Sequence, residues 1–187
     1  MLVNLKEILA IAEKGNFAIP AFNVYNMETV MGVINAAEEL GAPVILQSYS
    51  RLFTNEEAYF LAPVVLAAAK KAKVPVCFHL DHGASEHEVV RALTYGATGI
   101  MIDASSLPFE ENKSNTARVT ELCAHVGVPV EGELGHIGSV NDESMAAFTD
   151  PDEAKAYVEA TGVSALAILV GTAHGRYKKA PKLDIER

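Results

Sequence analysis

Residues 74–83 read VPVCFHLDHG and indicate the fold more clearly than any other stretch. Val74 to Phe78 form an apolar, β-branched run of the length of a buried strand, and polar residues and a glycine follow it. In a parallel barrel, the carboxyl end of such a strand carries active-site residues. The two histidines beside Asp81 therefore indicate either a metal ligand next to an acid or base, or core histidines that bond backbone carbonyls.

The same unit, a short apolar run followed by a longer amphipathic stretch, recurs about six times along the chain. The expected strands are Ala18–Phe22, Pro43–Leu46, Val74–Phe78, Gly99–Asp103, Val128–Glu133 and Ala165–Val170. The expected helices are Met27–Leu40, Asn55–Lys73, Ser85–Tyr95, Phe109–Val126 and Pro151 to Gly162. This alternation predicts an α/β fold, a single TIM-barrel domain, (β/α)₈, over residues 1–187, truncated before strands 7 and 8. The first βα turn lacks G-x-G-x-x-G, which argues against a dinucleotide-binding sheet.

Four further segments carry local predictions. Leu5 to Lys14 reads as a short helix that plugs or caps the domain. Ser85 is the expected N-cap of its helix, with Glu88 placed for a capping box. The polar residues 135–150 form a long loop, a kind of segment that is often functional. Residues 182–184 read as the start of another helix.

Composition narrows the class of protein. Half of the residues are hydrophobic, and the formal net charge of -9 argues against a nucleic-acid surface, which would gather Lys and Arg on one face. Cys77 and Cys123 show no metal-ligand spacing, which suits a reducing compartment. The start of the chain does not resemble a signal peptide, and no apolar run is long enough to span a bilayer. We therefore expect a cytoplasmic protein without a nucleic-acid or membrane partner.

Polar residues at the strand ends form the candidate site. They are Asn23, Gln47, Asp81, His82, Asp103, Glu133 and His174. A barrel brings such positions together, and imidazole nitrogen with carboxylate oxygen suits zinc. His82 and His174 supply two ligands, and Asp103 and Glu133 either complete a mixed site or hold a second cation. Each carboxylate taken alone is also explained by a helix cap or an ion pair.

Four motifs resemble, in their order, those of the class II, zinc-dependent ketose-bisphosphate aldolases. They are HLDHG at 79–83, MID at 101–103, VEGELG at 130–135 and GTAHGRYK at 171–178. Enzymes of that family cleave fructose or tagatose 1,6-bisphosphate to dihydroxyacetone phosphate and glyceraldehyde 3-phosphate. The resemblance implies a phosphorylated ketose as the substrate, a glycolytic type of carbohydrate metabolism, and a catalytic zinc ion that replaces a Schiff base.

The resemblance also assigns roles to residues. It implies that Asp81 carries the proton, that His82 and His174 bind the catalytic zinc, and that Asp103 and Glu133 match the positions of a second divalent or monovalent cation. The candidate substrate-binding residues are Asn23, at the end of the first strand, and Gly175, where a missing side chain lets a ligand approach the main chain.

The chain departs from the family pattern in three places. The family's third zinc histidine and its phosphate-binding loops follow a seventh strand, beyond Arg187, so we expect a fragment of a longer polypeptide. Asn141 stands where many relatives carry an acid, and Asp142 and Glu143 are the neighbouring acids. Residues 48–50 align ambiguously with a substrate-contacting serine.

Three alternatives stay open. A Schiff-base aldolase would use Lys178 or Lys179. A phosphosugar-binding or regulatory barrel, or an inactive fragment, would keep the metal motifs without turnover. A TIM-barrel zinc hydrolase would also place histidines at strand ends, but Asn23 stands where its H-x-H is expected. The preference between fructose and tagatose bisphosphate is not predicted, and a homodimer or homotetramer is the expected assembly.

Overall fold

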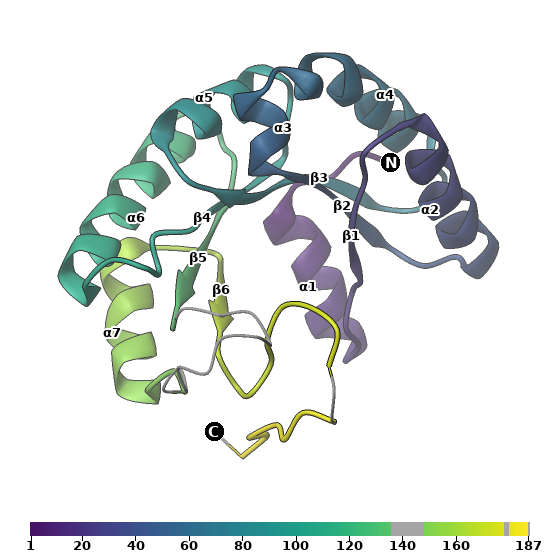
Figure 1. The fold of residues 1–187 in the computed structure, drawn as a ribbon. Coiled ribbons are helices and arrows are strands. Elements are labelled where there is room, and N and C mark those ends of the chain that lie inside the picture. Colours follow the sequence, from purple (N-terminus) through teal and green to yellow (C-terminus); the bar gives the residue numbers. More distant parts are fainter. Residues whose placement is uncertain (136–147, 178–179, 187) are drawn as a thin grey trace.

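The computed structural model describes residues 1–135, 148–177 and 180–186. It contains one sheet of six parallel strands in the order β1-β2-β3-β4-β5-β6. The strands are β1 (Ala21–Asn23), β2 (Val44–Tyr49), β3 (Val76–Gly83), β4 (Gly99–Ile102), β5 (Val130–Leu134) and β6 (Ala165–Ile168). The sheet curls around its inner face, as an incomplete TIM barrel does (Figure 1).

Helices occupy both sides of the curled sheet. They are α1 (Leu5–Gly15), α2 (Met27–Leu40), α3 (Ser50–Thr54), α4 (Glu57–Lys71), α5 (Glu86–Thr94), α6 (Phe109–Ala124) and α7 (Pro151–Thr161). Figure 1 shows α2 to α7 around the outside and α1 within the curl. Local sequence sets the ends, since Asn4 and Asn26 close capping boxes and Gly41 and Gly162 end α2 and α7 in the left-handed conformation.

Strand alternation divides the core into two parts. On the outer face, Leu46, Phe78 and Ile100 belong to the large cluster that packs against the helices. On the inner face, Ile45 and Cys77 pack with Leu5 and Ile8 of α1, and all four are buried. α1 therefore fills the inner face near the start of the strands, as the sequence predicts, and the later inward positions are left to polar residues.

Several predicted segments have other bounds in the structure; the expected strand Val74–Phe78, for example, is β3, Val76–Gly83. The expected strand Ala18–Phe22 is replaced by the shorter β1, because Pro20 has no N–H for the ladder and contributes only its carbonyl, which accepts from the Ile45 N–H at 3.0 Å. The expected helix Asn55–Lys73 is observed as the shorter α4, which begins at Glu57 because Glu56 takes a left-handed φ of 70° just before it. The short helix α3, which precedes it, was not predicted.

The expected helix start at residues 182–184 is wrong. The Asp184 N–H donates to the Val170 carbonyl at 2.9 Å, so this segment lies against the chain just after β6, and the described residues 182–184 are not helical. The capping box of α5 is also only half formed. Ser85 accepts from the Glu88 N–H as expected, but the Glu88 side chain accepts from the Ala84 N–H and not from that of Ser85.

None of the helices in the described residues is both long enough and apolar enough to cross a membrane.

Candidate metal and catalytic site

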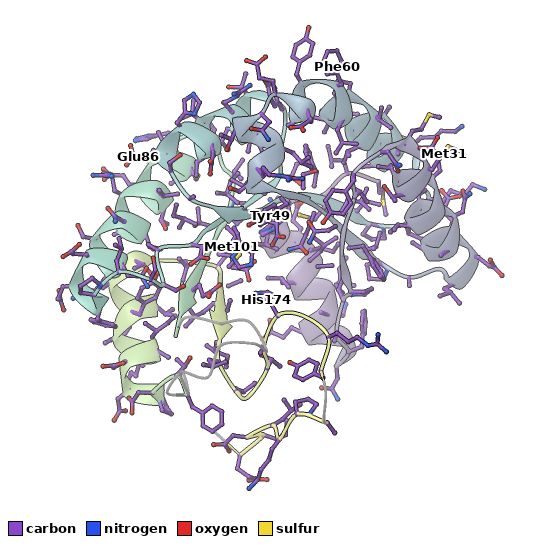
Figure 2. The ribbon with its side chains drawn as sticks, viewed as in Figure 1. Met31, Tyr49, Phe60, Glu86, Met101 and His174 are labelled. Carbon is purple, nitrogen blue, oxygen red and sulfur yellow. The ribbon has the colours of Figure 1, made fainter. Side chains whose placement is uncertain are left out.

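The carboxyl ends of the strands surround a pocket of ≈ 600 Å³. Its lining is formed by Asn23, Tyr25, Tyr49, Ser50, Asp81, His82, Ala84, Asp103 and His174. Figure 2 places Tyr49 and His174 near the centre of the curled sheet, whereas Phe60 and Met31 lie at its outer rim. The structure therefore gathers four of the predicted strand-end residues with His174 around one cavity.

The end of β3 is bent by an extra residue. The pairing between β3 and β4 shifts register between Leu80 and Gly83, and His82, within this bulge, has a φ of 50°. A left-handed conformation costs a histidine of order 1–3 kcal/mol, and such strain is concentrated at functional sites. Gly83 is required next to it, because a Cβ there would lie 2.7 Å from the Met101 carbonyl oxygen. The bulge aims the His82 ring into the pocket.

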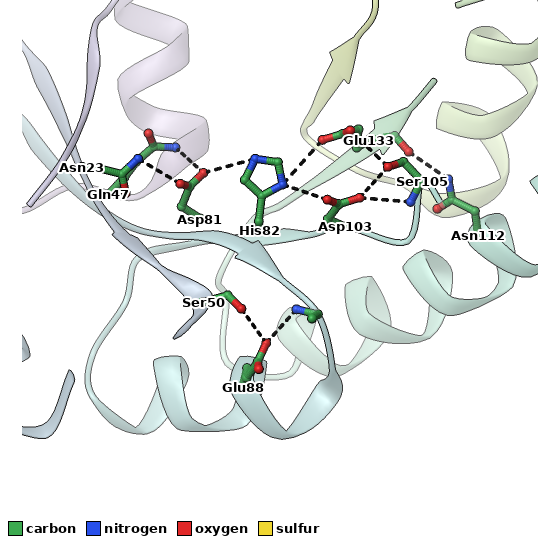
Figure 3. A network of polar contacts seen from close by, with 11 residues as sticks. Asn23, Gln47, Ser50, Asp81, His82, Glu88, Asp103, Ser105, Asn112 and Glu133 are labelled. Carbon is green, nitrogen blue, oxygen red and sulfur yellow. Dashed lines mark hydrogen bonds and ion pairs between the residues drawn. The ribbon is translucent and has the colours of Figure 1, made fainter. Parts of the chain in front are cut away.

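His82 lies among three carboxylates. Its Nδ1 is 2.8 Å from Asp103 Oδ2 and 3.8 Å from Glu133 Oε2, and its Nε2 is 4.0 Å from Asp81 Oδ1 (Figure 3). The hydrogen bond with Asp103, together with the negative charges of Asp81, Asp103 and Glu133, outweighs burial and raises the pKa of His82 to about 9. Without a metal, His82 is thus a cation at neutral pH.

Asp103 and Glu133 are joined through Ser105. The Ser105 hydroxyl lies 2.7 Å from Asp103 Oδ1 and 3.1 Å from Glu133 Oε1, and its N–H donates to Asp103 Oδ1 at 3.0 Å. Burial raises the pKa of Asp103, but hydrogen bonds from His82 and Ser105 outweigh it and hold that pKa at about 2. Glu133 is 1% exposed, and Asn112 Nδ2 donates to its backbone carbonyl at 2.8 Å. Both carboxyl groups are therefore held in fixed positions.

The donor set fits a zinc ion. Ligand atoms of His82, Asp103 and Glu133 lie within 4.8 Å of one another, and one imidazole with two carboxylates is a donor set that zinc accepts. The His174 ring lies beside His82, with ring centroids 5.5 Å apart, although it is not part of that three-residue group. When Asp103 accepts a hydrogen bond from the Nδ1–H of His82, Nε2 is the ring nitrogen that remains for a metal. Asp103 then orients the imidazole, as in the common carboxylate–histidine–metal arrangement.

Asp81 is held by two side-chain amides. Asn23 Nδ2 donates to its Oδ2 at 3.0 Å and Gln47 Nε2 donates to its Oδ1 at 3.2 Å (Figure 3). Asp81 as a whole residue is 7% exposed. Asn23, expected as a substrate contact, thus also orients Asp81. The sequence placed Gln47 at a strand end but gave no signal that it would bond Asp81, because that contact depends on the register between β2 and β3.

Gly175 follows His174 with a φ of 109°, a conformation that glycine adopts without strain. It is absent from the residues that line the pocket. Asn141, Asp142 and Glu143 lie outside the described residues, and so do Lys178 and Lys179.

His79 belongs to the core beneath the pocket. It is 1% exposed, and its Nε2 lies 3.4 Å from Glu131 Oε2. Burial, with a smaller effect from the charge of His82, lowers the pKa of His79 to about 4, so its ring is neutral. Burial and the charges of Asp81 and Glu133 raise the pKa of Glu131 to about 7. Of the two histidines that flank Asp81, only His82 reaches the pocket.

Comparison with known proteins gives consistent results. The family model described as fructose-bisphosphate aldolase class II matches residues 3–187. The structure of the YdjI aldolase from Escherichia coli K12 is 38% identical with a TM-score of 0.89, and the match covers 100% of this chain and 67% of that one. A putative fructose-1,6-bisphosphate aldolase from Coccidioides immitis is 32% identical with a TM-score of 0.90, and the match covers 98% of this chain and 67% of that one. Fructose-bisphosphate aldolase from Campylobacter jejuni is 28% identical with a TM-score of 0.78, and the match covers 99% of this chain and 63% of that one.

Proposed function

Because the chain belongs to the class II fructose-bisphosphate aldolase family, we propose that it is part of a zinc-dependent aldolase that cleaves a ketose 1,6-bisphosphate. The observation that carries this proposal is the convergence of Asp81, His82, Asp103 and Glu133 at the carboxyl ends of neighbouring strands, with His174 beside them. Asp81, His82, Asp103 and His174 line one pocket, and the buried Glu133 lies beside His82, so a proton carrier and a set of metal donors lie close together.

The proposed reaction breaks the C3–C4 bond of the ketose. The C4 hydroxyl loses its proton and becomes the aldehyde of glyceraldehyde 3-phosphate, and the electron pair of the broken bond stays on the dihydroxyacetone phosphate half. A zinc ion held by His82 and His174 would stabilise that negative charge as a Lewis acid. Asp103 and Glu133 would hold a second cation, or would orient the His82 ring through its Nδ1 atom.

Asp81 is the residue that we assign to proton transfer. Its two amide partners fix the plane of the carboxylate, and its position beside His82 places it next to the metal donors. A carboxylate within hydrogen-bond reach of the C4 hydroxyl can accept that proton during cleavage and return it during condensation. Asn23 and Gln47 therefore support catalysis by keeping Asp81 oriented.

We further propose that the active enzyme contains a segment beyond residues 1–187 that closes the barrel and completes the metal site. The proposal is supported by the relatives, of whose length this chain spans about two thirds. A further strand would bring a third neutral nitrogen or oxygen ligand, which a catalytic zinc site ordinarily has.

The test uses the full-length polypeptide with fructose and tagatose 1,6-bisphosphate, and measures triose phosphate release. Cleavage should disappear after EDTA treatment and return with zinc. The sugar that is cleaved faster, fructose or tagatose 1,6-bisphosphate, is the preferred substrate. Cleavage that survives EDTA but is lost with borohydride and substrate would instead establish a Schiff-base lysine. Zinc binding without cleavage of either sugar would instead favour a barrel that binds a phosphosugar or has a regulatory role without turnover.

A further inference from the structure

Glu88 is a buried acid that the proposed reaction does not use. It lies in the first turn of α5 and is 8% exposed. Within the described residues, it forms no ion pair with a Lys, Arg or His side chain. An unpaired carboxylate is costly to bury, so its hydrogen-bond partners must account for its presence.

Three donors from two different turns bind this carboxylate. The Ala84 N–H donates to Oε2 at 2.7 Å. The Ser50 hydroxyl donates to the same oxygen at 3.0 Å (Figure 3). The Thr54 hydroxyl donates to Oε1 at 2.7 Å. Ser50 and Thr54 are four residues apart in α3 and therefore share one face of that helix. Hydrogen bonds to a charged acceptor are stronger than neutral ones and offset the loss of hydration.

Both turns carry residues of the pocket. Ser50 follows Tyr49 at the end of β2, and Ala84 follows the bulge of His82 and Gly83 at the end of β3. Ser50, His82 and Ala84 all line the pocket. The carboxylate thus connects the two strand ends at the point where the chain leaves the sheet.

The connection bears directly on the strained residue. Gly83 and Ala84, the two residues after His82, are both fixed by hydrogen bonds. The Gly83 carbonyl accepts from the Asp103 N–H at 3.0 Å. The Ala84 N–H donates to the Glu88 carboxylate. With both groups fixed, the left-handed conformation of His82 is maintained by its neighbours, and the direction of its ring is set.

Building on the proposed function, we propose that Glu88 is a positioning residue, which ties the turns after β2 and β3 together and so holds His82 in the orientation that binds the metal. Glu88 touches neither the metal donors nor the proton carrier. Its effect passes through the Ala84 N–H to the bulge and through Ser50 to the end of the neighbouring strand β2.

The test compares Glu88→Ala, Glu88→Gln and Glu86→Ala in the full-length polypeptide. Glu88→Gln keeps an oxygen for Ala84 and Ser50, and its NH₂ group can donate to the Thr54 hydroxyl, which can turn to accept. Glu86 lies in the same turn but is only half-buried and pairs with Arg118, so Glu86→Ala is the matched control. The readouts are zinc affinity, by competition with a chromophoric chelator, and the visible spectrum of the Co²⁺-substituted protein.

Glu88→Ala should lower zinc affinity about 10- to 100-fold and change the Co²⁺ spectrum, as loss of residues that orient metal ligands does. Glu88→Gln should restore both readouts to the wild-type level, and Glu86→Ala should leave them unchanged. Wild-type zinc affinity in Glu88→Ala overturns the proposal, and so does a Glu88→Gln variant as defective as Glu88→Ala.

If Glu88→Ala does not fold, Ser50→Ala combined with Thr54→Val severs the same link from the α3 side while the carboxylate stays in place. That double variant should lower zinc affinity in the same direction, and wild-type affinity in it overturns the proposal. Zinc affinity is measured without substrate. Failure of the aldolase assignment therefore appears as absent cleavage by the wild-type protein, whereas failure of the Glu88 proposal appears as unchanged zinc binding.

Discussion

The imidazole rings of His82 and His174 lie 5.5 Å apart, centroid to centroid, with their planes inclined at 70°. One ring comes from the bulge that ends β3 and the other from the segment after β6. The curl of the sheet brings these two segments together. A pair of rings at this separation is compatible with a shared metal ion, and it is the relationship on which the proposed zinc site depends.

Replacing His174 by alanine should remove zinc without unfolding the protein. His174 is exposed in the described structure, so its loss should leave the melting temperature of the zinc-free protein unchanged. Zinc affinity and kcat/KM should each fall by at least about 100-fold, because a direct ligand is lost. Metal analysis of the purified variant checks this, and a full equivalent of zinc retained by His174→Ala would contradict the assignment.

Replacing Asp81 by asparagine should separate metal binding from catalysis. The amide is nearly isosteric but cannot accept a proton, so kcat should fall about 10²- to 10⁴-fold while zinc affinity stays near the wild-type value. The measurement is the rate of triose phosphate release by the zinc-loaded variant. An Asp81→Asn variant that retains wild-type kcat would assign proton transfer to another group.

The zinc-free protein should lose stability as the pH rises from about 6.5 to about 9. The pKa of His82 is raised from 6.5 to about 9 in the folded state, chiefly by its hydrogen bond to Asp103. Its stabilising effect is therefore complete below pH 6.5 and lost as the pH rises through about 9. After a discount for partial exposure, the free energy of unfolding should fall by about 1–2 kcal/mol over this interval.

Urea unfolding of EDTA-treated protein at a series of pH values measures this change, with His82→Gln as the control that should lack it. Asp103 acts in the opposite direction. Its pKa is lowered from 3.8 to about 2, so its contribution is complete above pH 3.8 and is lost as the pH falls through about 2. A wild-type stability that is flat between pH 6.5 and 9 would argue against the His82–Asp103 ion pair.

Adding one methyl group should have opposite effects at Gly83 and Gly32. At Gly83 a Cβ would lie 2.7 Å from the Met101 carbonyl oxygen and 2.8 Å from Leu80 Cδ2, so Gly83→Ala should destabilise the fold by about 1–3 kcal/mol. At Gly32, inside α2, a Cβ meets nothing within 4 Å, and Gly32→Ala should stabilise the helix by about 0.5–1 kcal/mol. Thermal unfolding of both variants measures the difference, and equal melting temperatures would contradict the close approach at Gly83.

The sequence predicted the repeated units because their signals are local. Apolar runs such as Val74–Phe78 identify buried strands, and Gly41 and Gly162 mark helix ends. The separate helix α3 and the start of α4 at Glu57 were missed because Glu56, which takes a left-handed conformation between them, is a residue type that seldom adopts it. The position of residues 182–184 against the chain just after β6 was missed because it depends on contacts between distant segments.

In the candidate site, too, features with a local sequence signal were predicted, and features that depend on contacts between distant segments were not. Strand-end residues such as Asp81, His82 and Asp103 were predicted because parallel strands must place their carboxyl ends at one edge. Ser105 was not predicted as part of the site, and Gln47 was predicted at a strand end but not as a partner of Asp81, since the bonds that each makes depend on side-chain geometry that spacing does not encode. Glu88 was expected to cap its own helix, and only the packing of α3 against α5 brings Ser50 and Thr54 to its carboxylate.

The outer strand β1 has a practical consequence for handling this polypeptide. Among the described strands it pairs with β2 alone, and Phe22 in its middle is 47% exposed. An open strand edge with an aromatic side chain is a template for pairing with other molecules. Residues 1–187 produced by themselves should therefore accumulate in inclusion bodies, and Phe22→Lys should shift the product toward the soluble fraction.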